Sequence, residues 1–203
     1  MRVLTIVGAR PQFIKAALIS EKIKASNFLT ELIIHTGQHY DENMSKIFFE
    51  EMQIPKPKYH LNINRMDYAL MIKKMTDSLL PIISSEKIDG VLVYGDTNST
   101  LAGSISAKIL NLPIFHVEAG LRSFNRLMIE ENNRLITDHL STLLFCPTKN
   151  AIKNLFNEQI SNDLIFSGDV MYDVFLKFLD GLKSSSEPQK NDKYVLATIH
   201  RRE

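Results

Sequence analysis

The sequence predicts an α/β protein built on a Rossmann-like parallel sheet with helices on both faces. Short β-branched runs alternate along the chain with longer segments whose apolar residues recur at helical spacing. The β-branched runs are apolar at almost every position, which is typical of parallel strands that are buried on both faces. Alternation of this kind predicts βαβ units that build one parallel sheet.

The predicted elements follow one another in order from the first residues. Expected strands occupy residues 3–7, 31–35, 90–94, 113–117, 143–146, 164–166 and 194–197. Expected helices occupy residues 12–25, 42–52, 68–86, 99–110, 131–140, 149–157 and 172–182. Open α/β sheets build their sites just beyond the carboxyl ends of the strands, so the connections that follow the strands are where functional side chains are expected.

One stretch interrupts the alternation and predicts a domain boundary. Residues 183–193 are polar, rich in serine and contain Pro188, which is typical of an interdomain linker. We therefore expect an N-terminal Rossmann-like domain over residues 1–182. Residues 194–203 are the expected start of a second domain, too short to fold alone. The chain is thus predicted to be the first half of a two-domain enzyme.

Composition excludes several classes of function. The chain carries 24 Lys and Arg against 23 Asp and Glu, so no overall field favours nucleic acid or a membrane surface as a partner. Every apolar run is shorter than the roughly 18 residues of a membrane span. Cys146 is the one cysteine, which rules out a disulfide framework and indicates a buried structural thiol. We expect a cytoplasmic protein.

The connection after the first strand has features of an anion site. Gly8 permits a tight turn, and Pro11 suits the start of a helix whose amide groups then face the site. Arg10 offers a bidentate fork and Lys15 a point charge, and both suit phosphate. Pairing with surface carboxylates remains the alternative for both residues. The nicotinamide-binding pattern G-x-G-x-x-G is absent here.

The second strand leads into a loop with two histidines, His35 and His39. Their spacing would suit a metal site on a helix, but Gly37 and the preceding strand argue against a helix there. We therefore expect no metal. A loop whose side chains, Gln38 and His39 among them, hydrogen-bond a ligand is the favoured interpretation.

Carboxylates follow the next two strands. Asp96 comes directly after a buried strand and is either a turn former or a general base, and the second role is favoured. Asn98 or Ser99 is the expected cap of the following helix. His116 and Glu118 share one face of the next strand, an unusual pair to bury unless they meet each other or a ligand.

A further pair of acidic residues opens the helix after that strand. Glu131 is expected to belong to a solvated first turn, which the helix dipole favours. Glu130 and Arg134 share a helix face and are expected to act as a carboxylate with its cationic partner. Asp96, Glu118 and Glu130, together with His200 near the C-terminus, make a proton-transfer site plausible, because neighbouring carboxylates push their pKa values apart.

Taken together, these segments resemble the motifs of the non-hydrolysing UDP-N-acetylglucosamine 2-epimerases. The resemblance covers essentially the whole chain, and the motifs occur in the family's order. They are Gly8-Ala-Arg-Pro-Gln-Phe-Ile-Lys15, Thr36-Gly-Gln-His39, Tyr94-Gly-Asp-Thr-Asn-Ser-Thr100, His116-Val-Glu-Ala-Gly-Leu-Arg122, Glu130-Glu-Asn-Asn-Arg134 and His200-Arg-Arg-Glu203. Within the family the chain looks most like the polysaccharide-biosynthesis branch, which includes a UDP-2,3-diacetamido-glucuronate 2-epimerase.

The resemblance implies a GT-B-type fold of two Rossmann-like domains facing across a cleft, of which this chain supplies the first. It implies inversion of the sugar at C2 by elimination of UDP and re-addition, with no cofactor and no metal. The catalytic group would be Asp96, Glu118, Glu130 and His200, and the substrate-binding group Arg10, Lys15, Gln38, His39 and Arg134. A homodimer is implied for the full-length form, and this chain alone is expected to be inactive. A glycosyltransferase of the same architecture and a non-catalytic isolated domain remain the alternatives.

Overall fold

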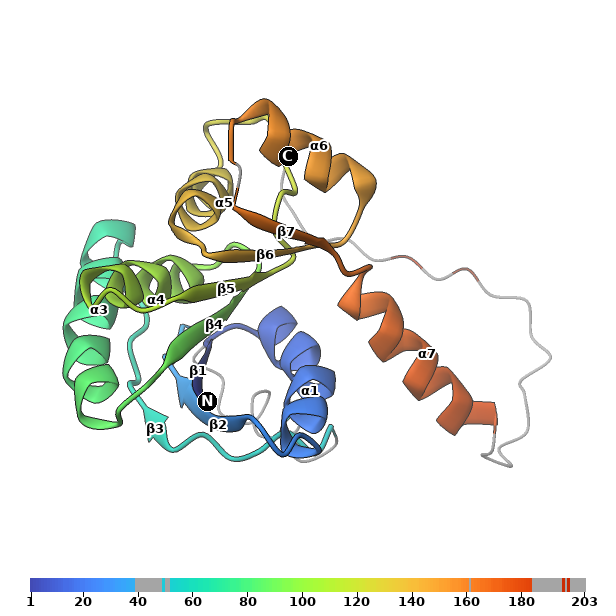
Figure 1. The fold of residues 1–203 in the computed structure, drawn as a ribbon, viewed down its shortest axis with the longest axis horizontal. Helices are drawn as coiled ribbons and strands as arrows, with labels where there is room; N and C mark the ends of the chain where they lie inside the picture. The colour runs from blue at the N-terminus through green and yellow to red at the C-terminus, as the bar shows by residue number, and fades with distance from the viewer. Residues whose placement is uncertain (39–48, 50–51, 161, 184–194, 196, 198–203) are drawn as a thin grey trace.

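The fold is one parallel sheet of seven strands, covered by helices on both faces (Figure 1). The computed structural model describes residues 1–38, 49, 52–160, 162–183, 195 and 197. Strand order is β3-β2-β1-β4-β5-β6-β7, and every neighbouring pair is parallel. The predicted fold class is therefore confirmed.

The observed elements match most of the predicted ones closely. The strands are β1 (Arg2–Val7), β2 (Thr30–His35), β3 (Tyr59–His60), β4 (Gly90–Tyr94), β5 (Ile114–Val117), β6 (Leu143–Cys146) and β7 (Asp163–Phe166). The described helices are α1 (Arg10–Lys24), α3 (Tyr68–Ser85), α4 (Asn98–Ile109), α5 (Ile129–Leu140), α6 (Lys149–Asn157) and α7 (Val170–Lys183).

The differences from the prediction are small and have local causes. The sequence gives no sign of β3, because two residues are too short to show a period. Helix α1 begins at Arg10, so Pro11 occupies its second position rather than its first. The expected helix at 42–52, the linker at 183–193 and the expected strand at 194–197 fall almost entirely outside the described residues.

Side chains that alternate along the strands supply two separate cores. Leu4 and Ile6 of β1 point to the face covered by α3 and α4, where Met75 and Leu79 of α3 pack against them. Val3 and Val7 of the same strand point to the opposite face, beneath α1. Figure 1 shows α3, α4 and α5 on one side of the sheet, with α1 and α7 on the other. Burial of apolar side chains on both faces is what makes the strands apolar throughout.

A smaller core under α6 contains the single cysteine. Cys146 packs with Leu144 of β6 and with Ala151 and Leu155 of α6, and all four are fully buried. Burial raises the pKa of the Cys146 thiol to about 11, so the thiolate is scarce near neutral pH. The prediction of a buried structural thiol is confirmed.

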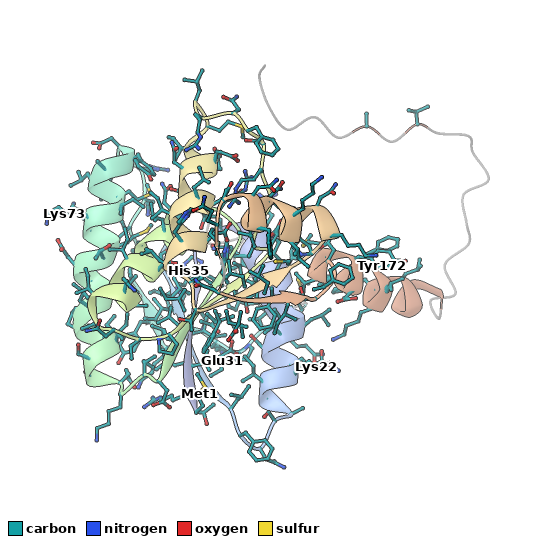
Figure 2. All side chains as sticks on the ribbon, turned by 45° about the horizontal axis from the view of Figure 1, so that its top comes forward. Met1, Lys22, Glu31, His35, Lys73 and Tyr172 are labelled. Atoms are coloured by element: carbon teal, nitrogen blue, oxygen red, sulfur yellow. The ribbon has the colours of Figure 1, made fainter. Side chains whose placement is uncertain are left out.

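One carboxyl group lies among the polar atoms beneath α1. Thr5 donates a hydrogen bond of 2.5 Å to Oε1 of Glu31 (labelled in Figure 2), while Oε2 of Glu31 is buried without a hydrogen-bond partner in the described part of the chain. Burial raises the pKa of Glu31, and the bond from Thr5 offsets this only in part. The charged form of Glu31 is therefore a cost to the fold at neutral pH.

Replacing Glu31 by Gln is expected to raise the free energy of unfolding at neutral pH by ~1 kcal/mol. The reason is that the folded-state pKa of this acid is raised, so stability falls as the pH rises from the unfolded pKa through the folded one. The gain should disappear in acid, where both proteins are neutral at this position. Urea unfolding at both pH values, with the exposed Glu21→Gln as control, checks this; equal gains at both pH values would contradict it.

Candidate active site

A cavity of about 580 Å³ lies at the carboxyl edge of the sheet. Strands β1, β4 and β5 are neighbours, so the loops that follow them meet at this edge. Three predicted site residues, Gln38, Asp96 and Glu130, line the cavity. The remaining lining residues are Ala9, Pro11, Thr97, Asn98, Leu127, Met128, Ile129 and Asn133.

Lys15 and Glu118 form an ion pair beside this cavity. Lys15 lies on α1 and is 7% exposed, and its Nζ contacts Oε2 of Glu118, which follows β5. A Cβ atom placed on Gly95 would lie 3.4 Å from the Glu118 carboxylate and 3.5 Å from the Lys15 ammonium. The pair therefore lies within ordinary contact distance of the backbone that carries Asp96, and the positive φ of 61° at Gly95 is what favours glycine there.

Nearby carboxylates stabilise the charged form of Lys15 against the effect of burial. Burial lowers the pKa of Lys15, and the negative charges of Asp96 and Asp169 oppose that shift. Asp169 lies in the connection between β7 and α7 and was not among the predicted site residues. The site thus combines a partly desolvated ammonium group, which suits binding of an anion, with carboxylates, which suit proton transfer.

Glu118 has an unusual backbone conformation. Its φ of 73° lies in the left-handed region, which is rarely adopted by residues other than glycine. Both Glu118 and Ala119 donate their amide protons to the carbonyl of Phe145, which holds the turn. Such conformations cost about 1–3 kcal/mol and concentrate at functional sites. Because of this turn, Glu118 leaves the alternation of β5 and reaches Lys15.

Arg134 pairs with different carboxylates from the one predicted. Its Nη2 lies 2.5 Å from Oδ2 of Asp96, and its Nη1 lies 2.7 Å from Oε2 of Glu131. The predicted pairing of Arg134 with Glu130 is therefore wrong. Residues three and four apart on a helix are both within reach, and here the loop that binds Glu131 decides between them. Arg134 connects α5 to the end of β4 and fixes the Asp96 carboxylate.

Glu131 is buried rather than solvated, so the prediction for this residue is also wrong. It is 1% exposed, and its carboxylate accepts hydrogen bonds from the amides of Ser123 and Phe124 and from the Ser123 hydroxyl. Burial alone would raise the pKa of Glu131, but these bonds and the contact with Arg134 lower it. Glu131 holds the 123–124 loop, while Glu130 faces the cavity.

Gln12 is a site-supporting residue that the sequence did not reveal. Its Oε1 accepts hydrogen bonds from the amides of Gly8 and Ala9, at 2.8 and 3.0 Å. Its Nε2 donates to the Tyr94 carbonyl and to the Thr100 hydroxyl. All four polar contacts are buried, so Gln12 fixes the loop after β1 against the end of β4. Only the observed packing shows this, since a glutamine near a helix start is common.

Gln38 binds the first turn of helix α4 from the loop after β2. Its Oε1 accepts from the amide of Ser99 at 3.0 Å and from the Ser99 hydroxyl at 2.8 Å. The N-cap itself is Thr97, whose hydroxyl accepts from the amide of Thr100, so the predicted cap at Asn98 or Ser99 is wrong by one or two residues. Gln38 thus joins the loop after β2 to the first turn of α4, at the wall of the cavity.

His116 lies beneath the site and does not open into it. The side chain is fully buried, with Nδ1 2.7 Å from Asp138 and Nε2 2.8 Å from the carbonyl of Gly95. Of the two outcomes expected for this pair, a contact between His116 and Glu118 is not observed, because the turn at Glu118 carries its side chain to Lys15.

The remaining predicted residues are placed only in part. Arg10 is exposed and begins α1, between the cavity-lining residues Ala9 and Pro11. His39 and His200 lie outside the described residues. Across the described residues, no three His, Cys, Asp or Glu side chains are grouped as metal ligands. A search of the same residues finds no helix with the length and apolarity of a membrane span.

Comparison with known proteins connects this geometry to one family. The sequence model of the family described as UDP-N-acetylglucosamine 2-epimerase matches residues 21–203. The UDP-2,3-diacetamido-2,3-dideoxy-D-glucuronate 2-epimerase of Pseudomonas aeruginosa is 50% identical over the whole chain, which spans 58% of that protein. The UDP-N-acetylglucosamine 2-epimerase of Methanococcus maripaludis is 42% identical over 98% of the chain and 56% of its own length.

Solved structures agree with the sequence matches. The Methanocaldococcus jannaschii UDP-GlcNAc 2-epimerase in complex with UDP-GlcNAc and UDP superposes with a TM-score of 0.88 at 43% identity, over 92% of this chain and 51% of that one. MurG from Acinetobacter baumannii, at a TM-score of 0.54 and 16% identity, shares the fold alone. The fold is that of the N-terminal domain of a GT-B-type protein, and the chain spans little more than half the length of its relatives. This chain belongs to the UDP-N-acetylglucosamine 2-epimerase family.

Proposed function

We propose that this chain supplies the acid–base part of a UDP-sugar 2-epimerase that acts on UDP-N-acetylglucosamine. The observation that carries the proposal is Asp96, which lines the cavity at the end of β4 and is fixed there by Arg134 at 2.5 Å. A carboxylate held in this way suits removal of a proton from a carbon atom.

The proposed reaction has two steps that mirror each other. A carboxylate takes the proton from C2 while the bond between C1 and the UDP oxygen breaks, which leaves a 2-acetamidoglucal and free UDP. An acid then returns a proton to C2 on the opposite face, and the UDP oxygen bonds to C1 again. The net change is inversion at C2, and no electrons are gained or lost. No cofactor enters this scheme.

The residues divide by position between proton transfer and binding. Asp96 and Glu130 both line the cavity and are the proposed base and acid, with Glu118 held next to them by Lys15. Arg10 and Lys15 are the proposed cations for the departing diphosphate, whose developing charge they would stabilise. His200 is the proposed contribution of residues 194–203, and Gln38 and His39 are proposed to face the substrate from the loop after β2.

We further propose that uridine is bound by a second domain, which corresponds to the part of the relatives that this chain does not span. The relatives are longer by two fifths of their length or more, and a cleft that closes between two domains would exclude water from the reaction. The 203-residue chain alone is then expected to be inactive, and the longer form is expected to be a homodimer.

Exchange of the C2 proton tests this proposal. We would incubate UDP-N-acetylglucosamine in D₂O with the 203-residue chain, and with the same chain continued by the unmatched remainder of the Pseudomonas relative. Proton NMR should show deuterium entering C2 with the continued protein and no exchange with the shorter one. Lack of exchange by the continued protein would contradict the function. Sugar transfer to an acceptor, without exchange at C2, would favour a glycosyltransferase instead.

A second substrate has one observation in its favour. The relative named for UDP-2,3-diacetamido-2,3-dideoxy-D-glucuronate is 50% identical to this chain, and so is a Methanococcus maripaludis protein named as a UDP-N-acetylglucosamine 2-epimerase homolog. The ratio of kcat/KM for the two sugars, measured by the same exchange assay, decides between them.

A further inference from the structure

His116 stands at one end of a line of polar side chains beneath the candidate active site. Its Nδ1 lies 2.7 Å from Oδ1 of Asp138. Oδ2 of Asp138 accepts from Nη1 of Arg122 at 2.7 Å and from the amide of Gly120 at 3.1 Å. Arg122 in turn makes a two-pronged contact with Glu158, at 2.8 and 2.6 Å. These two basic and two acidic side chains form one line, in which the side chains of His116, Asp138 and Arg122 are enclosed and that of Glu158 is partly exposed.

The partners of His116 fix which of its nitrogen atoms donate. Asp138 receives three hydrogen bonds, and its contacts with His116 and Arg122 outweigh burial and lower its pKa, so it is an acceptor only. The proton between Asp138 and His116 therefore sits on Nδ1. The Gly95 carbonyl also accepts only, so Nε2 must carry a proton to bond with it at 2.8 Å. His116 donates at both nitrogen atoms.

The bond from Nε2 reaches the peptide that precedes Asp96. Gly95 has a φ of 61°, and its carbonyl is the group that His116 holds. The next carbonyl, that of Asp96, accepts from Nδ2 of the buried Asn133 at 2.8 Å. Asp96 therefore lies between two carbonyl groups that are both fixed by buried side chains, while its carboxylate is bound by Arg134.

Stability alone gives little reason for this arrangement. Both His116 and Asp138 are 0% exposed, and enclosing charged groups in the interior carries a large desolvation cost. Apolar side chains of similar volume often give equal or greater stability than a buried ion pair. An apolar residue at position 116 would leave the Gly95 carbonyl without this donor. Gly95 stands one residue before the proposed base, Asp96.

We propose that His116 is a positioning residue for the proton-transfer step, which it serves by holding the Gly95 carbonyl and so fixing where the Asp96 carboxylate lies in the cavity. This role rests on the proposed function, because it takes Asp96 as the group that exchanges the C2 proton. His116 itself touches no substrate. It acts through the peptide between Gly95 and Asp96.

Two substitutions separate the two bonds of the imidazole ring. The amide of Gln in His116→Gln can reach the place of Nε2 and donate to Gly95. The shorter amide in His116→Asn reaches the place of Nδ1, so it keeps the bond to Asp138 and loses the bond to Gly95. We expect His116→Asn to lower kcat for C2 exchange by about 10²-fold with KM unchanged, since small misplacements of a catalytic group have effects of this size. His116→Gln should recover most of kcat, and the exposed His139→Gln should match the unmodified protein.

The kinetic comparison has clear contrary outcomes. Full activity in His116→Asn would overturn the proposal. Equal loss in both variants would do the same, because it would show a general effect of altering the core. A rise in KM with kcat unchanged would show a role in binding instead of positioning.

A measurement without substrate tests the contact independently. In ¹⁵N-labelled 203-residue chain, the imidazole spectrum of His116 should show protons on both nitrogen atoms, and the Asp96 amide signal should move in His116→Asn but stay close to its position in His116→Gln. An unprotonated Nε2 in the unmodified chain would overturn the proposal. This measurement needs neither variant, so it still tests the proposal if neither of them folds. Absence of C2 exchange in the unmodified longer protein would instead contradict the proposed function alone, since this spectrum does not depend on it.

Discussion

Replacing Asp96 by Asn is expected to lower the rate of C2 proton exchange by about 10²–10⁴-fold, the usual loss when a general base is removed. The amide keeps the size of the carboxylate but cannot accept the proton. KM should change little, because the proposed diphosphate contacts of Arg10 and Lys15 are left in place. The measurement is deuterium entry at C2 by NMR, in the protein form that is active without the substitution.

The Asp96 variant should fold normally, which makes the loss of rate interpretable. Arg134 keeps its second partner, Glu131, at 2.7 Å, and the Asp96 carbonyl keeps its bond from Asn133. The control is Asp163→Asn, which removes an exposed carboxylate from β7. Both variants should show the melting temperature of the unmodified protein, and only Asp96→Asn should lose exchange. Exchange at the normal rate in Asp96→Asn would remove Asp96 from the mechanism.

The sequence was sufficient to locate these carboxylates because the ends of buried strands can be predicted from the apolar runs. Asp96 follows a run of buried apolar residues, and in a parallel sheet every such run ends at the same edge. Glu130 and Gln38 were found in the same way, from connections between elements, and both line the cavity. The alternation that predicts the fold class thus also predicts where a site belongs, with no knowledge of side-chain contacts.

The side-chain partners of these carboxylates could not be predicted from the sequence, because contacts between distant segments determine them. Helical spacing allows Arg134 to reach either Glu130 or Glu131, and the 123–124 loop selects Glu131. The turn at Glu118 breaks the strand alternation that placed it beside His116. Asp138 lies in the middle of an amphipathic helix, and only the packing of α5 against β5 shows that it meets His116.

Replacing Asp138 by Asn is expected to have the largest effect on stability, lowering the free energy of unfolding by about 3–5 kcal/mol near neutral pH. Asp138 is 0% exposed and is the shared acceptor of His116, Arg122 and the Gly120 amide. An asparagine at this position turns one of its two polar atoms into a donor, which then faces donors. It also leaves the cationic Arg122 without this carboxylate in the interior.

The pH dependence of that loss follows from the direction of the shift. Burial would raise the pKa of Asp138, but the contacts with His116 and Arg122 lower it below its ordinary value. A carboxyl group whose folded-state pKa is lowered stabilises the fold above its unfolded pKa of about 3.9, and this contribution is lost as the pH falls through the folded value. The difference between Asp138→Asn and the unmodified chain should therefore be full near neutral pH and shrink in strong acid.

Urea unfolding of the two chains at neutral and acid pH measures this difference directly. Asp77→Asn is the matched control, because Asp77 contacts Lys73 on the outer side of α3, where both side chains are more than half exposed (Lys73 is labelled in Figure 2). Exposed pairs of this kind contribute little, so the control should unfold almost as the unmodified chain does. A loss in Asp138→Asn no greater than in Asp77→Asn would show that the line of polar side chains from His116 to Glu158 does not stabilise the fold. A loss that persists undiminished in acid would assign it to packing, because the ionised carboxylate would then contribute nothing.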